Sequence, residues 1–218
     1  MREHRGKTDR KTFLAKENAR NLRLHGLSWP LLAGCFFLLA FLGVMCSVSG
    51  LWSIQPDYCV AYVGSHGLTD EMYDAIESSF ISAGEDVNGD QEIAVQIRQY
   101  IIPDGGSEDK DMITAQLTAD INSCESFFFI LEDPESFQYS FGLLRFTDGR
   151  LPALDDYSAA GKTVFLSDSS FFSESLNGLS VSEAAFVEKL SIGVRGFWTE
   201  RTCKYEKEND ALWEKIML

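Results

Sequence analysis

An uncharged, strongly apolar stretch runs from Trp29 to Trp52 and divides the chain into two parts of opposite charge. The residues before it carry eight Lys or Arg against three Asp or Glu, a formal charge of +5 (eight minus three). The residues after it carry eleven Lys or Arg against thirty Asp or Glu, a formal charge of −19 (eleven minus thirty). The stretch is long enough to cross a bilayer, because a hydrocarbon core of about 30 Å needs about 20 apolar residues.

The flanks of this stretch predict how the chain is oriented in a membrane. Trp29 and Trp52 stand at its two ends, where amphipathic aromatic rings favour the headgroup layer. An excess of Lys and Arg marks the cytoplasmic side of a span. We therefore expect a cytoplasmic basic tail over 1–28, a transmembrane helix in contact with lipid over 29–52, and an extracytoplasmic domain over 56–218. The expected location is the cell membrane, with the C-terminal domain outside.

A cleaved signal peptide is the alternative for the same stretch. Ser47-Val48-Ser49 could serve as a small-residue cleavage site. A signal peptide, however, has an apolar core of about 7–15 residues, and the core here is longer. A permanent anchor is therefore the expectation.

The acidic charge of the outer part limits its partners. Nucleic acid requires a basic surface, because its phosphates are negative, so we expect no nucleic-acid partner. Outside the stretch lie Cys59, Cys124 and Cys203, an odd number without close spacing. This is not a disulfide framework, and we expect buried thiols with at most one bridge among them.

Apolar runs and alternating segments predict an α/β fold. The runs at 58–63 and 127–131 are continuous, which is typical of strands buried on both faces. Apolar and polar residues alternate over 93–102, which predicts a strand with one wetter face. Helices are expected over 68–83, from Ser107, from Ser182 and over 209–217, with a helical turn at 133–134. A further strand is expected over 163–166. Residues 190–194 fit either a helix or a strand, and residues 137–157 show no regular pattern. This order predicts a mostly parallel sheet with helices on both faces.

Three positions predict where helices begin or end. Thr69 is a suitable N-cap, with acidic residues following it in the first turn. Gly84 suits a left-handed C-cap. Val181 and Phe186 bracket Ser182 as a hydrophobic staple brackets an N-cap, which places the start of that helix at Ser182.

The sharpest local motif is an acidic loop before the alternating strand. Positions one, three, five and seven of a calcium loop would be supplied by Asp86, Asn88, Asp90 and Glu92. Position six is Gln91 instead of the turn-forming glycine, and position twelve is an isoleucine instead of a bidentate glutamate. The alternative is a polar turn in which the Asp and Asn side chains bond their own backbone and Gly89 is left-handed. Ca²⁺ is therefore an expected cofactor only if a further carboxylate reaches the loop.

Catalytic motifs are sparse. His66 is the single histidine after the apolar stretch, and a Ser–His pair would have to be built around it. The adjacent acids Glu132 and Asp133 could act as glycosidase-like carboxylates, although adjacent acids in loops are usually solvated. No cluster of His and Cys has zinc spacing. We expect no enzymatic activity.

Several segments resemble known proteins. Tyr58 to Gly64, Gly84 to Asp90 and Cys124 to Glu135 resemble uncharacterised single-pass membrane proteins of Gram-positive gut bacteria. Gln116 to Pro134, followed by Leu151 to Tyr157, is similar to one lobe of the extracellular solute-binding proteins of ABC importers. The resemblance implies a single lobe of that kind. Solute-binding proteins grip their ligand between two lobes, so no ligand residue carries over to this chain.

Three hypotheses about function follow. The first is a membrane-anchored, extracytoplasmic, non-enzymatic domain that binds a partner protein or a weak ligand, with Ca²⁺ as a stabilising ion. The second is an accessory solute-binding component of an ABC-type transporter, with a membrane protein as partner. The third is a cell-envelope hydrolase that uses Glu132 and Asp133. A deep pocket at the carboxyl ends of the strands would favour solute binding, and an exposed apolar patch would favour partner binding.

Overall fold

The computed structural model describes residues 34–41, 43, 55–103, 108–196 and 204–218. The chain separates into two units, Met1–Ile54 and Gln55–Leu218. In the first unit, residues 34–41 and 43 are helical and exposed. A search of the described residues finds no helix both long and apolar enough to span a bilayer. Most of the predicted helix over 29–52, and all of the basic tail over 1–28, lies outside the described residues.

The second unit is built on a five-stranded sheet with the order β2-β1-β3-β5-β4. Its strands are β1 (Tyr58–Gly64), β2 (Val95–Ile101), β3 (Phe128–Leu131), β4 (Thr163–Phe165) and β5 (Ser191–Val194). β1 pairs in parallel with β2 and β3, whereas β5 runs antiparallel to both β3 and β4. The predicted α/β class is confirmed. The sheet is mixed: β1, β2, β3 and β4 run in the same direction, as the predicted mostly parallel sheet requires, and β5 runs against them, which was not predicted. The direction of β5 depends on the path taken after β4, and an apolar run such as 191–194 looks the same in either direction.

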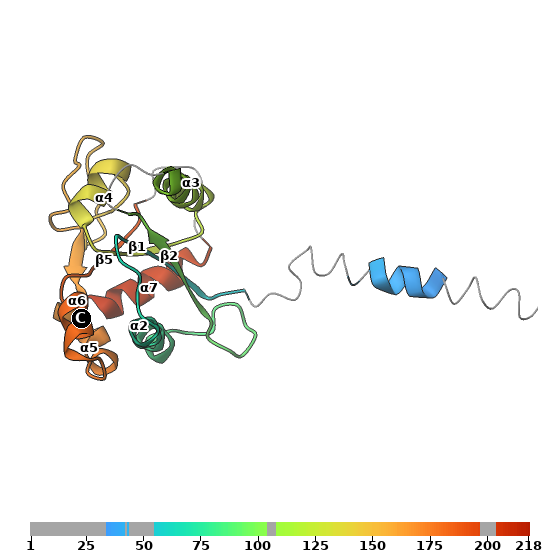
Figure 1. Ribbon diagram of the computed structural model, residues 1–218. Helices are drawn as coiled ribbons and strands as arrows, with labels where there is room; N and C mark the ends of the chain where they lie inside the picture. The colour runs from blue at the N-terminus through green and yellow to red at the C-terminus, as the bar shows by residue number, and fades with distance from the viewer. Residues whose placement is uncertain (1–33, 42, 44–54, 104–107, 197–203) are drawn as a thin grey trace, which may run out of the picture. The chain divides into compact units, whose positions relative to one another are not determined.

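Helices cover both faces of the sheet, as predicted (Figure 1). One face is covered by α2 (Asp70–Ala83), α5 (Ser170–Leu176), α6 (Val181–Val187) and α7 (Glu206–Ile216). The other face is covered by α3 (Glu108–Ser123) and α4 (Pro134–Phe141). Alternate residues of β1 serve the two layers, since Val60 packs in the first core and Ala61 in the second.

The ends of the helices follow the predictions in part. Thr69 caps α2 as expected, because its Oγ1 accepts the backbone N–H of Met72 at 3.3 Å. Gly84 ends α2 with φ −71° and ψ 171°, so the predicted left-handed C-cap is wrong. The glycine is required there for another reason. A Cβ at this position would lie 2.6 Å from the carbonyl oxygen of Phe80 and 2.7 Å from the ring of Tyr58.

The start of α6 also differs from the prediction. Ser180, and not Ser182, caps the helix. Ser180 and Glu183 form a capping box, in which the Glu183 carboxylate accepts the backbone N–H of Ser180 at 2.9 Å. Because a carboxylate at the third helical position can reach back in this way, the pair outweighed the staple pattern around Ser182. The expected cap Ser107 lies outside the described residues.

Two further elements were not anticipated in full. The turn predicted at 133–134 continues as α4 to Phe141, and α5 lies in a segment for which no helix was expected. The α5 sequence is rich in serine and phenylalanine, which are middling helix formers. Burial of Phe172, which is 0% exposed, supplies the tertiary stabilisation that intrinsic propensity does not.

The order of the first three strands creates a topological switch point. From β1 the chain passes through α2 to β2 on one side, and from β2 through α3 to β3 on the other side of β1. In open α/β sheets, ligands bind beside the carboxyl ends of the strands at such a point. The topology therefore predicts a binding site formed by the residues that follow β1 and β3.

Candidate functional sites

A polar cluster occupies the switch point. Ser65 and His66 directly follow β1, and Glu132 directly follows β3. The Glu132 carboxylate accepts hydrogen bonds from the backbone N–H groups of Ser65 at 2.7 Å and His66 at 3.3 Å. It also lies 2.9 Å from His66 Nδ1 and 3.2 Å from the Ser65 hydroxyl. One carboxylate thus collects four donors from the loop after β1.

The electrostatics of this cluster follow from its hydrogen bonds. Burial acts to raise the pKa of Glu132, but the hydrogen bonds from His66 and Ser65 outweigh it, so the pKa is lowered. The pKa of Tyr62 is raised, first by burial and then by the nearby charge of Glu132. The Tyr62 hydroxyl donates to the carbonyl of His66 at 2.6 Å. A Cβ on Gly64 would lie 2.5 Å from that hydroxyl oxygen and 2.6 Å from Glu132 Oε2, so the cluster requires glycine there.

The geometry does not match a Ser–His–acid triad. The Ser65 hydroxyl lies 3.0 Å from His66 Nδ1, the same nitrogen that faces Glu132. In a triad, the acid and the nucleophile use different ring nitrogens. Asp133 serves another element, because its carboxylate accepts the backbone N–H of Ser136 at 3.0 Å and caps α4. The acids named in the hydrolase hypothesis therefore do not act as a pair, and the cluster joins two loops.

The predicted calcium loop is a series of turns closed by its own side chains. Asp86 accepts the backbone N–H groups of Gly89 at 2.6 Å and Gln91 at 2.8 Å. Asn88 accepts from Asp90 at 2.8 Å, and Asp90 accepts from Glu92 at 3.0 Å. This is the polar turn named above as the alternative, and Gly89 is left-handed as that alternative requires (φ 79°). Gln91 also has a positive φ of 74°, so the backbone adopts at position six the shape that glycine supplies in calcium loops.

A residue that sequence reasoning missed holds this loop to the sheet. Asp57 is 2% exposed, and its carboxylate accepts the backbone N–H groups of Val87 and Asn88 at 2.8 and 2.9 Å and of Ala94 at 2.8 Å. No group of three or more His, Cys, Asp or Glu side chains in the described part of the chain is arranged to hold a metal ion. Calcium binding by Asp86, Asn88, Asp90 and Glu92 remains a prediction.

Exposed apolar side chains gather on α4 and the loop that follows it. We call Tyr139, Leu154 and Tyr157 the aromatic surface; their exposed fractions are 75%, 83% and 51%. The rings of Tyr139 and Tyr157 are in contact, with centroids 6.1 Å apart. These residues lie in the segment 137–157 that the sequence left irregular. The available signal was large apolar residues in a stretch without helical or strand periodicity.

Two buried polar residues fix the loop between Leu154 and Tyr157 by bonding to Asp156. Gln138 is 0% exposed; its side chain accepts the backbone N–H of Leu144 at 2.9 Å and donates to the carbonyl of Asp156 at 3.2 Å. Lys162 is also 0% exposed, and its ammonium donates to the same carbonyl at 2.9 Å. It lies 3.2 Å from the Asp156 carboxylate and 5.4 Å from the centre of the Phe146 ring. The loop that carries Leu154 and Tyr157 is therefore tied down at Asp156.

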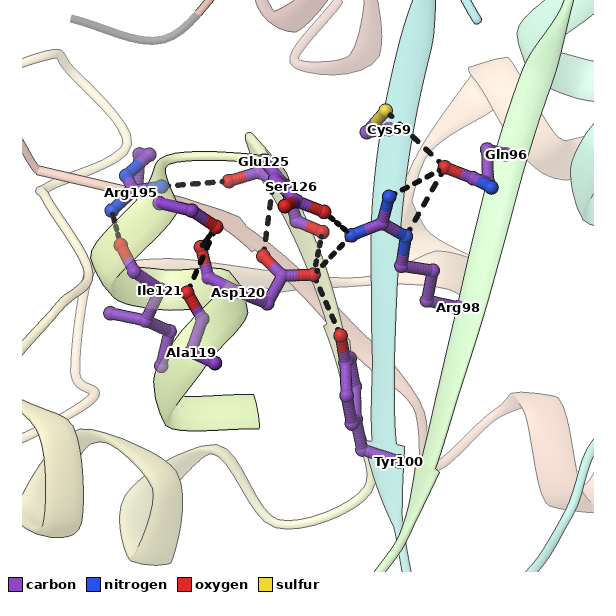
Figure 2. A network of polar contacts seen from close by, with 11 residues as sticks. Cys59, Gln96, Arg98, Tyr100, Ala119, Asp120, Ile121, Glu125, Ser126 and Arg195 are labelled. Carbon is purple, nitrogen blue, oxygen red and sulfur yellow. Dashed lines mark hydrogen bonds and ion pairs between the residues drawn. The ribbon is translucent and has the colours of Figure 1, made fainter. Parts of the chain in front are cut away.

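A second polar network joins α3 to β2 (Figure 2). Asp120 of α3 is 4% exposed and accepts from the Tyr100 hydroxyl at 2.7 Å and from Ser126 through its backbone N–H at 3.0 Å and its hydroxyl at 2.8 Å. Arg98 lies 3.3 Å from Asp120 and also pairs with Glu125. The pKa of Tyr100 is raised, chiefly by burial and then by its hydrogen bond to Asp120.

Arg195 completes this network at the end of α3. Its guanidinium donates to the carbonyls of Ser126 at 3.1 Å and Ile121 at 2.7 Å, as Figure 2 shows. It thereby satisfies a carbonyl that the helix end leaves without an intrahelical partner. The network fastens the end of α3 to the sheet, and Arg98 is fully engaged with two carboxylates.

No protein-family model, no curated protein and no solved structure matches this chain. The resemblance to single-pass membrane proteins and to a solute-binding lobe therefore rests on the sequence segments alone.

Proposed function

We propose that the chain is a membrane-anchored, extracytoplasmic and non-enzymatic domain that binds a partner protein through the aromatic surface. The observation that carries the proposal is the contact between the exposed rings of Tyr139 and Tyr157, together with the 83% exposure of Leu154, three residues before Tyr157 in the chain. Exposed apolar groups clustered on one surface mark interaction sites in soluble domains. The anchor rests on the uncharged stretch over 29–52.

The bonds that fix the loop between Leu154 and Tyr157 strengthen the proposal. Removing a charged lysine from water is unfavourable by several kcal/mol, and Lys162 offsets this through its bonds to Asp156. The result is a loop held in one conformation. A rigid surface loses little entropy on binding, and tyrosine adds a large contact area with few rotatable bonds.

Charge defines the chemistry of the partner. Glu135 lies one turn before Tyr139 on α4, Asp155 directly follows Leu154, and the part of the chain after the apolar stretch carries a formal charge of −19. A partner segment that carries Lys or Arg beside apolar side chains fits this surface, and long-range attraction would speed its association. Two copies of this acidic domain repel each other, so we assign the surface to a different protein.

The test is affinity capture with the full-length chain in detergent, comparing wild type with Leu154→Ser and Tyr157→Ser. Val181→Ser is the matched control, because Val181 is 90% exposed but lies on α6. A partner should be retained by wild type and by Val181→Ser, lost with both surface variants, and released by raised salt. Capture of the same proteins by all four chains, or a lost partner without a basic apolar segment, would contradict the proposal.

The alternative function, an accessory solute-binding component of an ABC-type transporter, predicts a pocket at the carboxyl ends of the strands. At the switch point, Ser65 and His66 are instead bonded to Glu132. A cavity is present at the opposite end of the sheet, beside the amino ends of the strands.

A further inference from the structure

A cavity of about 310 Å³ opens at the amino ends of β1, β2 and β3. Cys59 of β1, Arg98 of β2 and Phe127 before β3 line it, together with Lys204 and Asn209 near the C-terminus. This volume lies at the lower end of the range of small-molecule sites. The cavity is distinct from the aromatic surface, whose residues do not line it.

Asn209 of α7 carries a buried acceptor that no described residue partners. The residue is 3% exposed, and its Nδ2 donates to the carbonyl of Lys204 at 3.0 Å. Its Oδ1 is buried and has no hydrogen-bond partner among the described residues. Buried polar groups are almost always hydrogen-bonded in native proteins, so this acceptor calls for a donor from outside the described chain.

The backbone around the cavity is strained. Cys124 and Tyr205 both line the cavity, and both are non-glycine residues in the left-handed region, with φ of 57° and 53°. This conformation is unfavourable for side chains with a Cβ, and such strain clusters at binding sites. The two residues come from segments some 80 positions apart in the chain.

Lys204 brings a positive charge that no carboxylate of the described residues neutralises. Its ammonium donates to the Gln55 side-chain oxygen at 2.6 Å and lies 5.6 Å from the centre of the Tyr205 ring. Within the described ranges, no carboxylate lies within ion-pair distance of it. Arg98 differs, because Asp120 and Glu125 already pair with its guanidinium (Figure 2). Lys204 is therefore the group that can receive an anion.

Two cysteines, Cys59 and Cys124, line the cavity. Burial raises the pKa of Cys59, and the charge of Arg98 only partly opposes this, so the thiol stays protonated near neutral pH. Cys124 is 7% exposed. With the Cys59 thiol protonated and its polar groups fixed, the cavity is suited to binding and not to nucleophilic chemistry.

We infer that this cavity binds a small organic carboxylate that also carries an amino or hydroxyl donor. The carboxylate would pair with the Lys204 ammonium, and the donor would satisfy Asn209 Oδ1. This inference does not depend on the aromatic surface or on its partner.

The test measures thermal stability and binding of the full-length chain in detergent against four separate ligand sets. These are α-amino acids, α-hydroxy acids, simple monocarboxylates such as acetate and propionate, and simple alkylamines. One of the first two sets should raise the melting temperature by several degrees at millimolar concentration, and the third and fourth should not. The responding set identifies the donor as ammonium or hydroxyl.

Two variants locate the site. Lys204→Met keeps the apolar stem and should weaken binding at least tenfold, and Asn209→Leu should do the same while the chain still unfolds cooperatively. Lys189→Met is the control, because Lys189 is exposed and lies outside the cavity. The inference is overturned if no set stabilises the wild type, if acetate stabilises it as well as the donor-bearing acids do, or if Lys204→Met binds like wild type.

Discussion

The two ends of the sheet differ in whether the described residues supply partners for their polar groups. At the carboxyl end, Glu132 accepts hydrogen bonds from Ser65 and His66 at the point where α/β folds usually bind ligands. At the amino end, Lys204 lacks a carboxylate partner in the described structure and Asn209 keeps an unpaired acceptor. Topology indicates where a site can form, and the balance of hydrogen bonds indicates whether the chain itself already occupies it.

The largest effect is expected from Gly64→Ala, which disrupts the hydrogen-bonded cluster at the carboxyl end of the sheet. The new Cβ would meet the Tyr62 hydroxyl at 2.5 Å and Glu132 Oε2 at 2.6 Å. We expect a loss of about 3 kcal/mol in unfolding free energy, because overpacking forces neighbours to move. Denaturant unfolding of the full chain, followed by circular dichroism, measures it. Gly178→Ala, whose Cβ has its nearest contact at 4.0 Å, is the control.

A milder change, Glu132→Gln, should cost about 1–2 kcal/mol at neutral pH, since hydrogen bonds to a charged acceptor are stronger than neutral ones. The wild-type pKa of Glu132 is lowered from 4.5 on folding. The stability that ionised Glu132 adds to the folded state is therefore fully present above about pH 5. It is lost as the pH falls through the folded-state pKa of Glu132. The stability difference between wild type and Glu132→Gln should shrink over that acidic window. A difference that stays constant from neutral to acidic pH would contradict this account.

The acidic loop before β2 tests whether the amino end also takes a cation. If Asp86, Asn88, Asp90 and Glu92 hold Ca²⁺, millimolar Ca²⁺ should stabilise the chain by about 1 kcal/mol, as mass action predicts for a site of millimolar affinity. Asp86→Ala and Asp90→Ala should abolish the rise in melting temperature. An equal concentration of Mg²⁺ controls for ionic strength. An unchanged wild-type melting temperature would rule out the site.

The smallest effect belongs to Asn209→Leu at the amino end. The substitution removes the buried Oδ1 that has no partner among the described residues, which is favourable, but also the hydrogen bond from Nδ2 to the Lys204 carbonyl, which is unfavourable. The two changes partly cancel, so unfolding free energy should fall by less than about 1 kcal/mol. Measured beside Glu132→Gln, it compares one polar deletion at each end of the sheet. A loss above about 2 kcal/mol would mean that Asn209 is already satisfied in the folded chain.

Much of the fold could be predicted from the sequence, because buried strands and helices have characteristic spacings of apolar residues along the chain. The apolar run at 58–63 predicted β1, and Thr69 with the acidic residues after it predicted where α2 begins. The direction of β5 was not readable, since it depends on the turns after β4. The start of α6 at Ser180 required weighing a capping box against a staple.

The candidate sites were readable to a much smaller extent. Cys59, Cys124 and Lys204 line one cavity but come from separate parts of the chain, with no motif that links them. His66 and Glu132 are ordinary loop residues until β1 and β3 pair in parallel and bring them within 2.9 Å. Sequence spacing carries information about elements, whereas these sites are created by contacts between elements.

The central position of β1 has a consequence for the order of assembly during synthesis. β1 is the first strand of the folded unit to be made, yet both of its edges are covered only when β2 and β3 have followed. Until then a seven-residue strand of mostly buried side chains has two unpaired edges, which favours aggregation. Chains that end before Leu131 cannot complete the centre of the sheet, so nascent chains of that length should be the ones that depend on chaperones.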